Sequence, residues 1–218
     1  MFTQNVAQAK QPYRTDAYLD TFQMFSGVAL ILFMWSHMVL VASVNLGSRV
    51  MNSIAHFLEA TYLAQIGGPM IALIFLAHFV MAARKIPFNY KEQKAMWTHS
   101  VRLNHLDTWL WIVQAVTGMI ILIMGSIHMW TVLTDLPITA AKSAARIQGG
   151  WWLVFYMMLL PVIELHVGVG FYRLGVKWGW ITRSNRKSLK NFENRLTIGF
   201  ITIGLITLFT FYFIIKAA

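Results

Sequence analysis

Residues 108–134 read TWLWIVQAVTGMIILIMGSIHMWTVLT, an apolar run that Asp107 and Asp135 bound and that contains no acidic or basic residue except one histidine. The run is longer than the roughly 20 residues that an α-helix needs to cross a bilayer. Its histidine, His128, lies in the second half. The run therefore predicts a transmembrane helix that carries an ionisable ring at membrane depth.

The chain has four further long apolar runs, and its overall composition also indicates a membrane protein. Hydrophobic residues make up 57% of the 218 and charged residues 12%, with a mean hydropathy of +0.57, whereas a soluble domain carries about 25% charged residues. We therefore expect an all-α fold, a membrane-spanning bundle of five transmembrane helices in a single membrane domain over residues 1–218. The expected spans are about 21–46, 63–84, 108–133, 150–174 and 195–216, with a short amphipathic outer segment at about 48–60.

The basic residues are distributed unevenly between the two sides of the expected membrane. Most of the 18 Lys and Arg residues lie in the N-terminal tail, which includes Lys10 and Arg14, and in the connections after the second and fourth spans. The positive-inside rule assigns these segments to the cytoplasm, so the N-terminus is expected inside and the C-terminus outside. Two interpretations stay open: the basic segments orient the chain and contact anionic lipid, or they form a docking face for a soluble subunit.

Four of the seven histidines lie within the spans, one on each of the first four: His37, His78, His128 and His166. Ionisable residues inside a membrane are costly and mark functional sites. Each of the four lies in the later part of its span, and successive spans run in opposite directions. His37 and His128 are therefore expected at an outer level, and His78 and His166 at an inner level. Two imidazoles from different helices can supply both axial ligands of a haem iron, so we expect two haems stacked between the first four spans.

The first and third spans share a spacing pattern. It is Gln23-x-x-Ser26 followed by His37 in one span, and Gln114-x-x-Thr117 followed by His128 in the other. Eleven residues of helix turn by about 1,100° and rise by about 16 Å, which returns the chain to nearly the same face. The hydroxyl residues are thus expected at the inner level, where small side chains leave room for a macrocycle, and the glutamines near propionates or ring edges. Ordinary small-residue packing between helices explains the pattern equally well.

Glu164 is an acidic residue inside the fourth span. It precedes His166 by two positions, about 200° around a helix, so the two side chains cannot ligate the same iron. We interpret Glu164 as a proton relay, and a neutral, hydrogen-bonded acid is the other interpretation.

Five stretches of the chain match a known family. They are FMWSHM (33–38), LAHFVMAARKIPFNY (76–90), NHLDTWLWIVQAVTG (104–118), GSIHMW (125–130) and ELHVGVGFYRLGVKWGW (164–180). Together they resemble the dihaem cytochrome b membrane subunit of the succinate dehydrogenase/fumarate reductase family, over about residues 20–215. The similarity is greatest to bacterial menaquinol:fumarate reductases with one membrane chain, and the last stretch is its most specific part.

The resemblance implies a membrane anchor in the bacterial inner membrane with two haem b groups. Electrons from menaquinol would pass through the haems toward iron–sulfur and flavoprotein subunits on the cytoplasmic side, and fumarate chemistry would lie in a partner. The chain has no cysteine, so any protein-ligated iron–sulfur cluster belongs to another subunit. In the family's pattern His78 and His166 hold the inner haem iron, and His37 and His128 the outer one.

The resemblance also implies roles for charged residues. Glu59 stands where the family places the carboxylate that accepts a quinol proton, although its surroundings depart from the family's pattern and a surface charge capping the second span is the other interpretation. Among the basic residues that flank the ligand helices, we expect Lys177 and Arg84 to pair with propionates.

Other functions remain as alternatives. The same subunit in a succinate:menaquinone reductase, running in the opposite direction, would need the same haems. A proton-coupled transporter predicts inverted repeats around a midplane site, whereas the repeat found here is parallel and its histidines lie off centre. A haem-free structural anchor is the remaining alternative.

Overall fold

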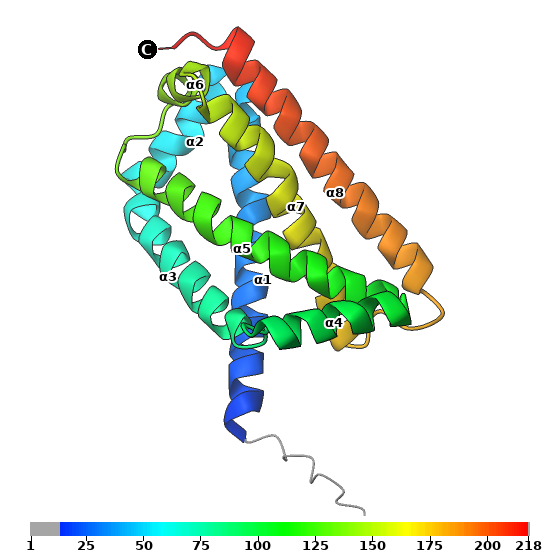
Figure 1. Cartoon of the computed structure of the whole chain (residues 1–218). Helices are drawn as coiled ribbons and strands as arrows, with labels where there is room; N and C mark the ends of the chain where they lie inside the picture. Colours follow the sequence, from blue (N-terminus) through cyan, green and yellow to red (C-terminus); the bar gives the residue numbers. More distant parts are fainter. Residues whose placement is uncertain (1–13, 218) are drawn as a thin grey trace, which may run out of the picture.

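Five long helices form the bundle. The structure is a computed structural model that describes residues 14–217, and within these residues it contains helices and no strand (Figure 1). The helices long and apolar enough to cross a membrane are α1 (Arg14–Ala42), α3 (Leu63–Ala83), α5 (Leu106–Leu133), α7 (Trp152–Lys177) and α8 (Arg186–Phe209). The expected all-α fold with five membrane-spanning helices is confirmed. Lys10, part of the expected basic tail, lies outside the described residues.

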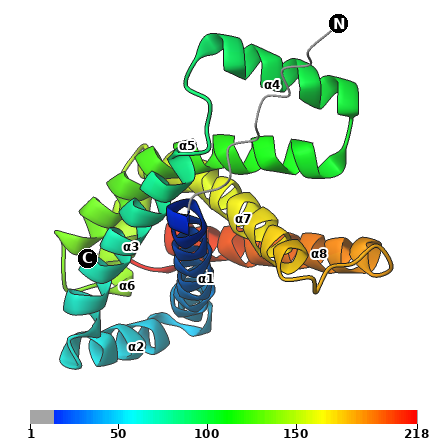
Figure 2. The same cartoon turned by 90° about the horizontal axis from the view of Figure 1, so that it is seen from below.

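Shorter helices lie at the two ends of the bundle. A 3-10 turn (η1, Ser43–Leu46), α2 (Ser48–Ala60) and α6 (Ala140–Gln148) gather at one end near the C-terminus, and α4 (Tyr90–Leu103) lies across the other (Figures 1 and 2). Neither α4 nor α6 was predicted from the sequence. Both begin at a capping side chain, because Asn89 accepts from the amide of Lys91 and Thr139 from that of Lys142. The location of α2 at a membrane surface stays a prediction.

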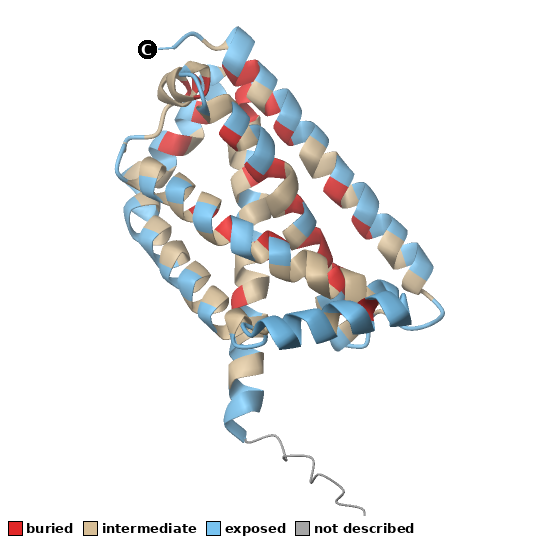
Figure 3. Cartoon of the chain, in the orientation of Figure 1, coloured by how far each residue is buried: buried red, intermediate tan, exposed pale blue. Residues whose placement is uncertain are grey.

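The helices bury few residues against one another and expose many apolar side chains, as is typical of a membrane bundle. Buried residues concentrate where α7 meets its neighbours α5 and α8, whereas no residue of α3 is buried within the chain (Figure 3). Large apolar side chains point outward along the bundle, as Leu32, Leu73 and Ile123 do. In water such a surface would drive association, but in a membrane it is the surface that contacts the acyl chains.

The last helix is tied by side-chain hydrogen bonds to the end of the bundle that carries α6. After Phe209 the helix widens into a π-helical turn (η2, Thr210–Ile214), which changes the pattern of its carbonyl partners. The side-chain amide of Gln148 donates to the carbonyls of Phe211 and Ile215 at 2.8 and 2.9 Å. Because an unpaired carbonyl is costly at membrane depth, these bonds hold α8 against α6 even though α8 carries none of the four intramembrane histidines.

Candidate functional site

A large cavity extends through the inside of the bundle. Its volume is about 1100 Å³, above the roughly 300–1,000 Å³ of most small-molecule pockets. The four intramembrane histidines line it, one each from α1, α3, α5 and α7. Most of the remaining lining is apolar, and side chains such as Ile31, Phe75 and Leu160 form its walls. The cavity is therefore suited to large, flat and mainly apolar groups.

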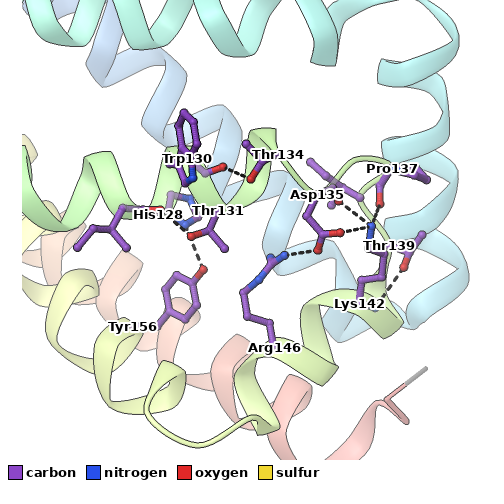
Figure 4. Close-up of polar contacts among 12 residues, drawn as sticks. His128, Trp130, Thr131, Thr134, Asp135, Pro137, Thr139, Lys142, Arg146 and Tyr156 are labelled. Atoms are coloured by element: carbon purple, nitrogen blue, oxygen red, sulfur yellow. Dashed lines mark hydrogen bonds and ion pairs between the residues drawn. The ribbon is translucent and has the colours of Figure 1, made fainter.

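The two outer histidines are direct neighbours across this cavity. The ring centroids of His37 and His128 lie 5.9 Å apart, with 61° between the ring planes. Phe33 stacks on His37 at 5.6 Å. Nδ1 of His128 lies 3.2 Å from the hydroxyl of Tyr156 on α7 (Figure 4). The chain directions thus bring the rings of α1 and α5 together at one level.

A charged cluster adjoins the outer pair. The Arg146 guanidinium, largely buried, lines the cavity and pairs with Asp135 at 2.6 Å, while Lys142 pairs with the other carboxylate oxygen at 2.7 Å (Figure 4). The hydrogen bond from Lys142, reinforced by the charge of Arg146, lowers the pKa of Asp135 from its ordinary value. Two cations share one carboxylate here, so this end of the cavity has a net positive charge that suits an acidic group of a ligand.

His78 is held against α1. Its Nδ1 lies 3.0 Å from the hydroxyl of Ser26 and 3.1 Å from the carbonyl oxygen of Gln23. The ring also packs on Gly27, where an added Cβ would lie 3.1 Å from Cε1 of His78. Since Ser26 precedes His37 by eleven residues, about 16 Å of helix rise, His78 lies one level below the outer pair.

His166 is held against α5 in the same manner. Its Nδ1 lies 3.0 Å from the hydroxyl of Thr117, and its Nε2 lies 3.2 Å from the side-chain nitrogen of Gln114. An added Cβ on Gly118 would again lie 3.1 Å from Cε1 of the ring. The α1–α3 and α5–α7 pairs therefore both place a hydroxyl and a glycine against the imidazole ring. The shared spacing of α1 and α5 did not predict these contacts.

The residues around the cavity fit two haems. Gln23 and Gln114 both line the cavity. Their side-chain oxygens are buried and have no hydrogen-bond partner among the described residues. Such unpaired acceptors are costly unless a bound group or water reaches them. Among residues 14–217 no cluster of three or more His, Cys, Asp or Glu side chains could hold a bare ion. A haem iron needs only two axial ligands from the protein, which each histidine pair can supply.

The basic residues at the inner end divide into two groups. Lys177 lines the cavity, as do Lys85 and Arg173. Arg84 does not, because its guanidinium pairs with Asp16 at 2.9 Å and with Asp20 at 2.5 Å and so ties the end of α3 to the start of α1.

The two carboxylates singled out in the sequence lie outside the cavity lining. Glu59 at the end of α2 accepts the backbone N–H of Ile138 at 3.0 Å, and Ile138 itself lines the cavity. Glu164 is 1% exposed, and its Oε1 has no partner in the described part of the chain. It shares a face of α7 with Gly168, which packs on Glu193 of α8.

Two polar residues, Tyr156 and Glu193, were not predicted from the sequence. Tyr156 contacts His128, but no motif distinguishes it from other residues near a helix end. Arg146, one of the basic residues that flank the ligand helices, lines the cavity. Glu193, which belongs to α8, is 4% exposed and pairs with Lys190. His105 caps α5 by accepting the N–H of Asp107 at 3.3 Å.

The fold and the cavity define a multi-pass membrane protein whose interior cavity is lined by four histidines, two of which are in contact. Residues 90–214 match the family described as Succinate dehydrogenase/Fumarate reductase transmembrane subunit. The chain is 35% identical over 201 residues to the fumarate reductase cytochrome b subunit of Helicobacter pylori, which covers 88% of this chain and 78% of the relative. It is 34% identical over 217 residues to the subunit of that name from Wolinella succinogenes, with 91% and 85% covered. The chain therefore belongs to the family of succinate dehydrogenase/fumarate reductase transmembrane subunits, as its resemblance implied.

Proposed function

We propose that this chain is the membrane-anchor and electron-transfer subunit of a menaquinol:fumarate reductase and binds two haem b groups. The supporting observation is the placement of four imidazoles in one cavity at two levels. The outer iron would be held by His37 and His128, and the inner iron by His78 and His166. A haem iron held by two histidines in this way would supply reversible one-electron transfer and would leave no position for oxygen.

Other residues would hold the edges of the two haems. At the outer end Arg146 offers a guanidinium that faces the cavity, and at the inner end Lys177 offers an ammonium. A carboxylate between such groups gains charge-assisted hydrogen bonds. Arg84 would have to exchange its ion pairs with Asp16 and Asp20 to reach a propionate, so we favour Lys177 for this role.

Glu59 is our candidate for the base that accepts a menaquinol proton at the outer end. The amide of Ile138 fixes one carboxylate oxygen at 3.0 Å, and Oε2 has no hydrogen bond from residues 14–217. Ile138 and Leu58 both line the cavity beside it. A carboxylate held at one oxygen and open at the other can take a proton from a bound hydroxyl group.

Glu164 is our candidate for a proton relay within the membrane. It is fully buried at the α7–α8 contact, and one of its oxygens has no partner among the described residues. A buried carboxyl that forms no ion pair can gain or lose a proton when the charge nearby changes. Its position two residues before His166 places it close to the inner level.

The end of the bundle that carries α4 is proposed to face the cytoplasm. Lys91, Lys94 and Arg102 lie exposed on α4, beside the exposed ring of Trp97, and the positive-inside rule favours this side. The N-terminus would then be cytoplasmic and the C-terminus periplasmic in a bacterial inner membrane. The flavoprotein and iron–sulfur subunits would dock at this end, and fumarate would be reduced there.

Purification from membranes under mild detergent tests the assignment. The chain should copurify with a flavoprotein and an iron–sulfur protein, and the complex should reduce fumarate with a menaquinol analogue. A chain that purifies alone from membranes with active fumarate reduction would contradict the proposal. The second candidate is a succinate:menaquinone reductase, which the family description admits. It would show faster succinate oxidation than fumarate reduction in the same preparation.

A further inference from the structure

The hydroxyls of Ser26 and Thr117 each touch Nδ1 of an inner-level imidazole, at 3.0 Å in both cases. Each hydroxyl also donates to a carbonyl of its own helix. Ser26 donates to Gln23 at 3.0 Å, and Thr117 donates to Val113 at 2.6 Å. A hydroxyl has one hydrogen and two lone pairs. With its hydrogen engaged by the helix, each hydroxyl can only accept from the imidazole.

The protonation of the two rings follows from this bonding. An imidazole that donates from Nδ1 carries its hydrogen there, and a neutral ring then has its lone pair on Nε2. For His166 a second contact agrees with this tautomer, because the side-chain nitrogen of Gln114 lies 3.2 Å from Nε2 and can only donate. An iron bound to Nε2 would take the same lone pair and displace this contact. For His78 the carbonyl of Gln23 at 3.1 Å is a second acceptor for the same Nδ1 hydrogen.

The glycines beside the two hydroxyls contribute space. At Gly27 and at Gly118 an added Cβ would lie 3.1 Å from Cε1 of the neighbouring ring, tighter than ordinary van der Waals contact. Each imidazole therefore has its Nδ1 edge against a hydroxyl and its Cε1 edge over bare backbone. Two features of one helix face thus fix the ring's tautomer and its position together.

The outer pair lacks this arrangement. His128 contacts Tyr156 at 3.2 Å, but the described residues offer the phenol no hydrogen bond to a backbone carbonyl, so its hydrogen is not committed. For His37 the described part of the chain shows a stacking partner, Phe33, and no hydrogen bond to its ring nitrogens. The device is specific to the inner level.

We propose that Ser26 with Gly27, and Thr117 with Gly118, are matched positioning residues that hold His78 and His166 as Nδ1–H tautomers with Nε2 presented to the inner haem iron. This inference rests on the proposed haem binding. A hydrogen bond from Nδ1 to an acceptor makes the ring a stronger electron donor, which favours the oxidised iron. Loss of the acceptor should therefore raise the midpoint potential of the inner haem.

The test is a redox titration of the purified complex, with the ferric EPR signal recorded for each variant. Thr117→Val keeps the shape and removes the acceptor, Ser26→Ala removes the other, and Thr117→Ser restores a hydroxyl. Thr131→Val is the matched control, because Thr131 is on the same helix and bonds only the carbonyl of Ile127, at 2.8 Å. Partners of this kind change metal-site equilibria by roughly 10- to 100-fold, and a tenfold change for one electron is about 59 mV.

We expect Thr117→Val to raise the potential of the inner haem alone by at least this tenfold change and to move its EPR signal. Ser26→Ala should raise it less, because the carbonyl of Gln23 remains as an acceptor for the Nδ1 hydrogen of His78. Thr117→Ser and Thr131→Val should match the wild type. Equal potentials in Thr117→Val and wild type, with both haems present, would overturn the inference and leave haem binding intact. Loss of the inner haem in both Thr117→Val and Thr117→Ser would also overturn it, since volume rather than the hydroxyl would then matter. Wild-type protein without haem would instead refute the proposed function.

Discussion

The imidazole ring of His37 on α1 lies edge-on to that of His128 on α5, with 5.9 Å between the ring centroids. Both helices run in the same direction, so two residues late in their helices meet at one level. The helices that run the opposite way carry His78 and His166, whose Nδ1 atoms rest on Ser26 and Thr117. Alternating chain direction thus produces two ligand levels.

Single replacements of the four histidines should reveal this pairing. His37→Ala and His128→Ala should each lose the same haem and keep the other, because each removes one ligand of the outer level. His78→Ala should lose the haem that both of those variants retain. The redox potential of the surviving haem identifies it in each case. Survival of different haems in His37→Ala and His128→Ala would refute the pairing.

Replacement of Glu59 by Gln should stop quinol oxidation while haem content stays normal. The amide oxygen of Gln can still accept the Ile138 N–H that Glu59 binds at 3.0 Å, so the connection between α2 and α6 should keep its shape. The variant has lost the general base, and a general base raises the reaction rate by about 10²- to 10⁴-fold. Ser53→Ala, at an exposed residue of α2 whose hydroxyl bonds only the carbonyl of Arg49, is the control and should retain full turnover. Unchanged menaquinol oxidation in Glu59→Gln would remove the proposed role.

Replacement of Glu164 by Gln should separate electron transfer from proton transfer. The amide is close in size to the buried carboxyl of Glu164 but cannot carry a proton, so both haems should bind while turnover in sealed vesicles falls. The measurement is proton uptake on haem reduction, followed with a pH indicator. Wild-type proton uptake in the variant would show that Glu164 is a structural acid.

Replacement of Gly118 by Ala should destabilise the haem-free and the haem-bound protein alike. Its Cβ would lie 3.1 Å from Cε1 of His166, and overpacking of this kind costs about 1–3 kcal/mol. Gly199→Ala in α8 is the matched control, since nothing lies within 4 Å of its added Cβ. There the better helix propensity of Ala should stabilise by about 0.5–1 kcal/mol. Thermal unfolding in detergent should therefore shift in opposite directions, and equal shifts would contradict the close contact.

The ion pairs of Asp135 should make the outer end sensitive to pH. Lys142, and then Arg146, holds the pKa of Asp135 below its ordinary value. A group whose pKa is lower in the folded state stabilises the fold above its unfolded pKa, and the effect is lost as pH falls through the folded value. Wild type should unfold at a higher temperature than Asp135→Asn near neutral pH, and the difference should shrink as the pH falls below about 4. A constant difference would exclude this linkage.

The long helices could be predicted because the need to cross a bilayer depends on the length of an apolar run alone. All but the last residue of the run 108–134 accordingly fall within α5. The short helices could not, since α4 and α6 depend on single caps at Asn89 and Thr139 and carry no long apolar run. Local capping is a weak signal in a sequence without an apolar pattern.

The candidate site, too, could be predicted only in part. The levels of the histidines follow from chain direction and residue number, as His37 and His128 illustrate. The contact of Ser26 with His78 does not follow, because it depends on how α1 and α3 rotate against each other. The ion pairs of Arg84 with Asp16 and Asp20 do not follow from the sequence either. They join α3 to α1, and the spacing pattern contains no information on how these two helices contact each other.

The most direct test of haem binding by the four histidines is a reduced-minus-oxidised visible spectrum of the purified protein, combined with haem and protein quantification. Two b-type haems per chain, resolved as two separate potentials in a redox titration, are the predicted result. One haem per chain, or none, would contradict the assignment of the four intramembrane histidines to two irons.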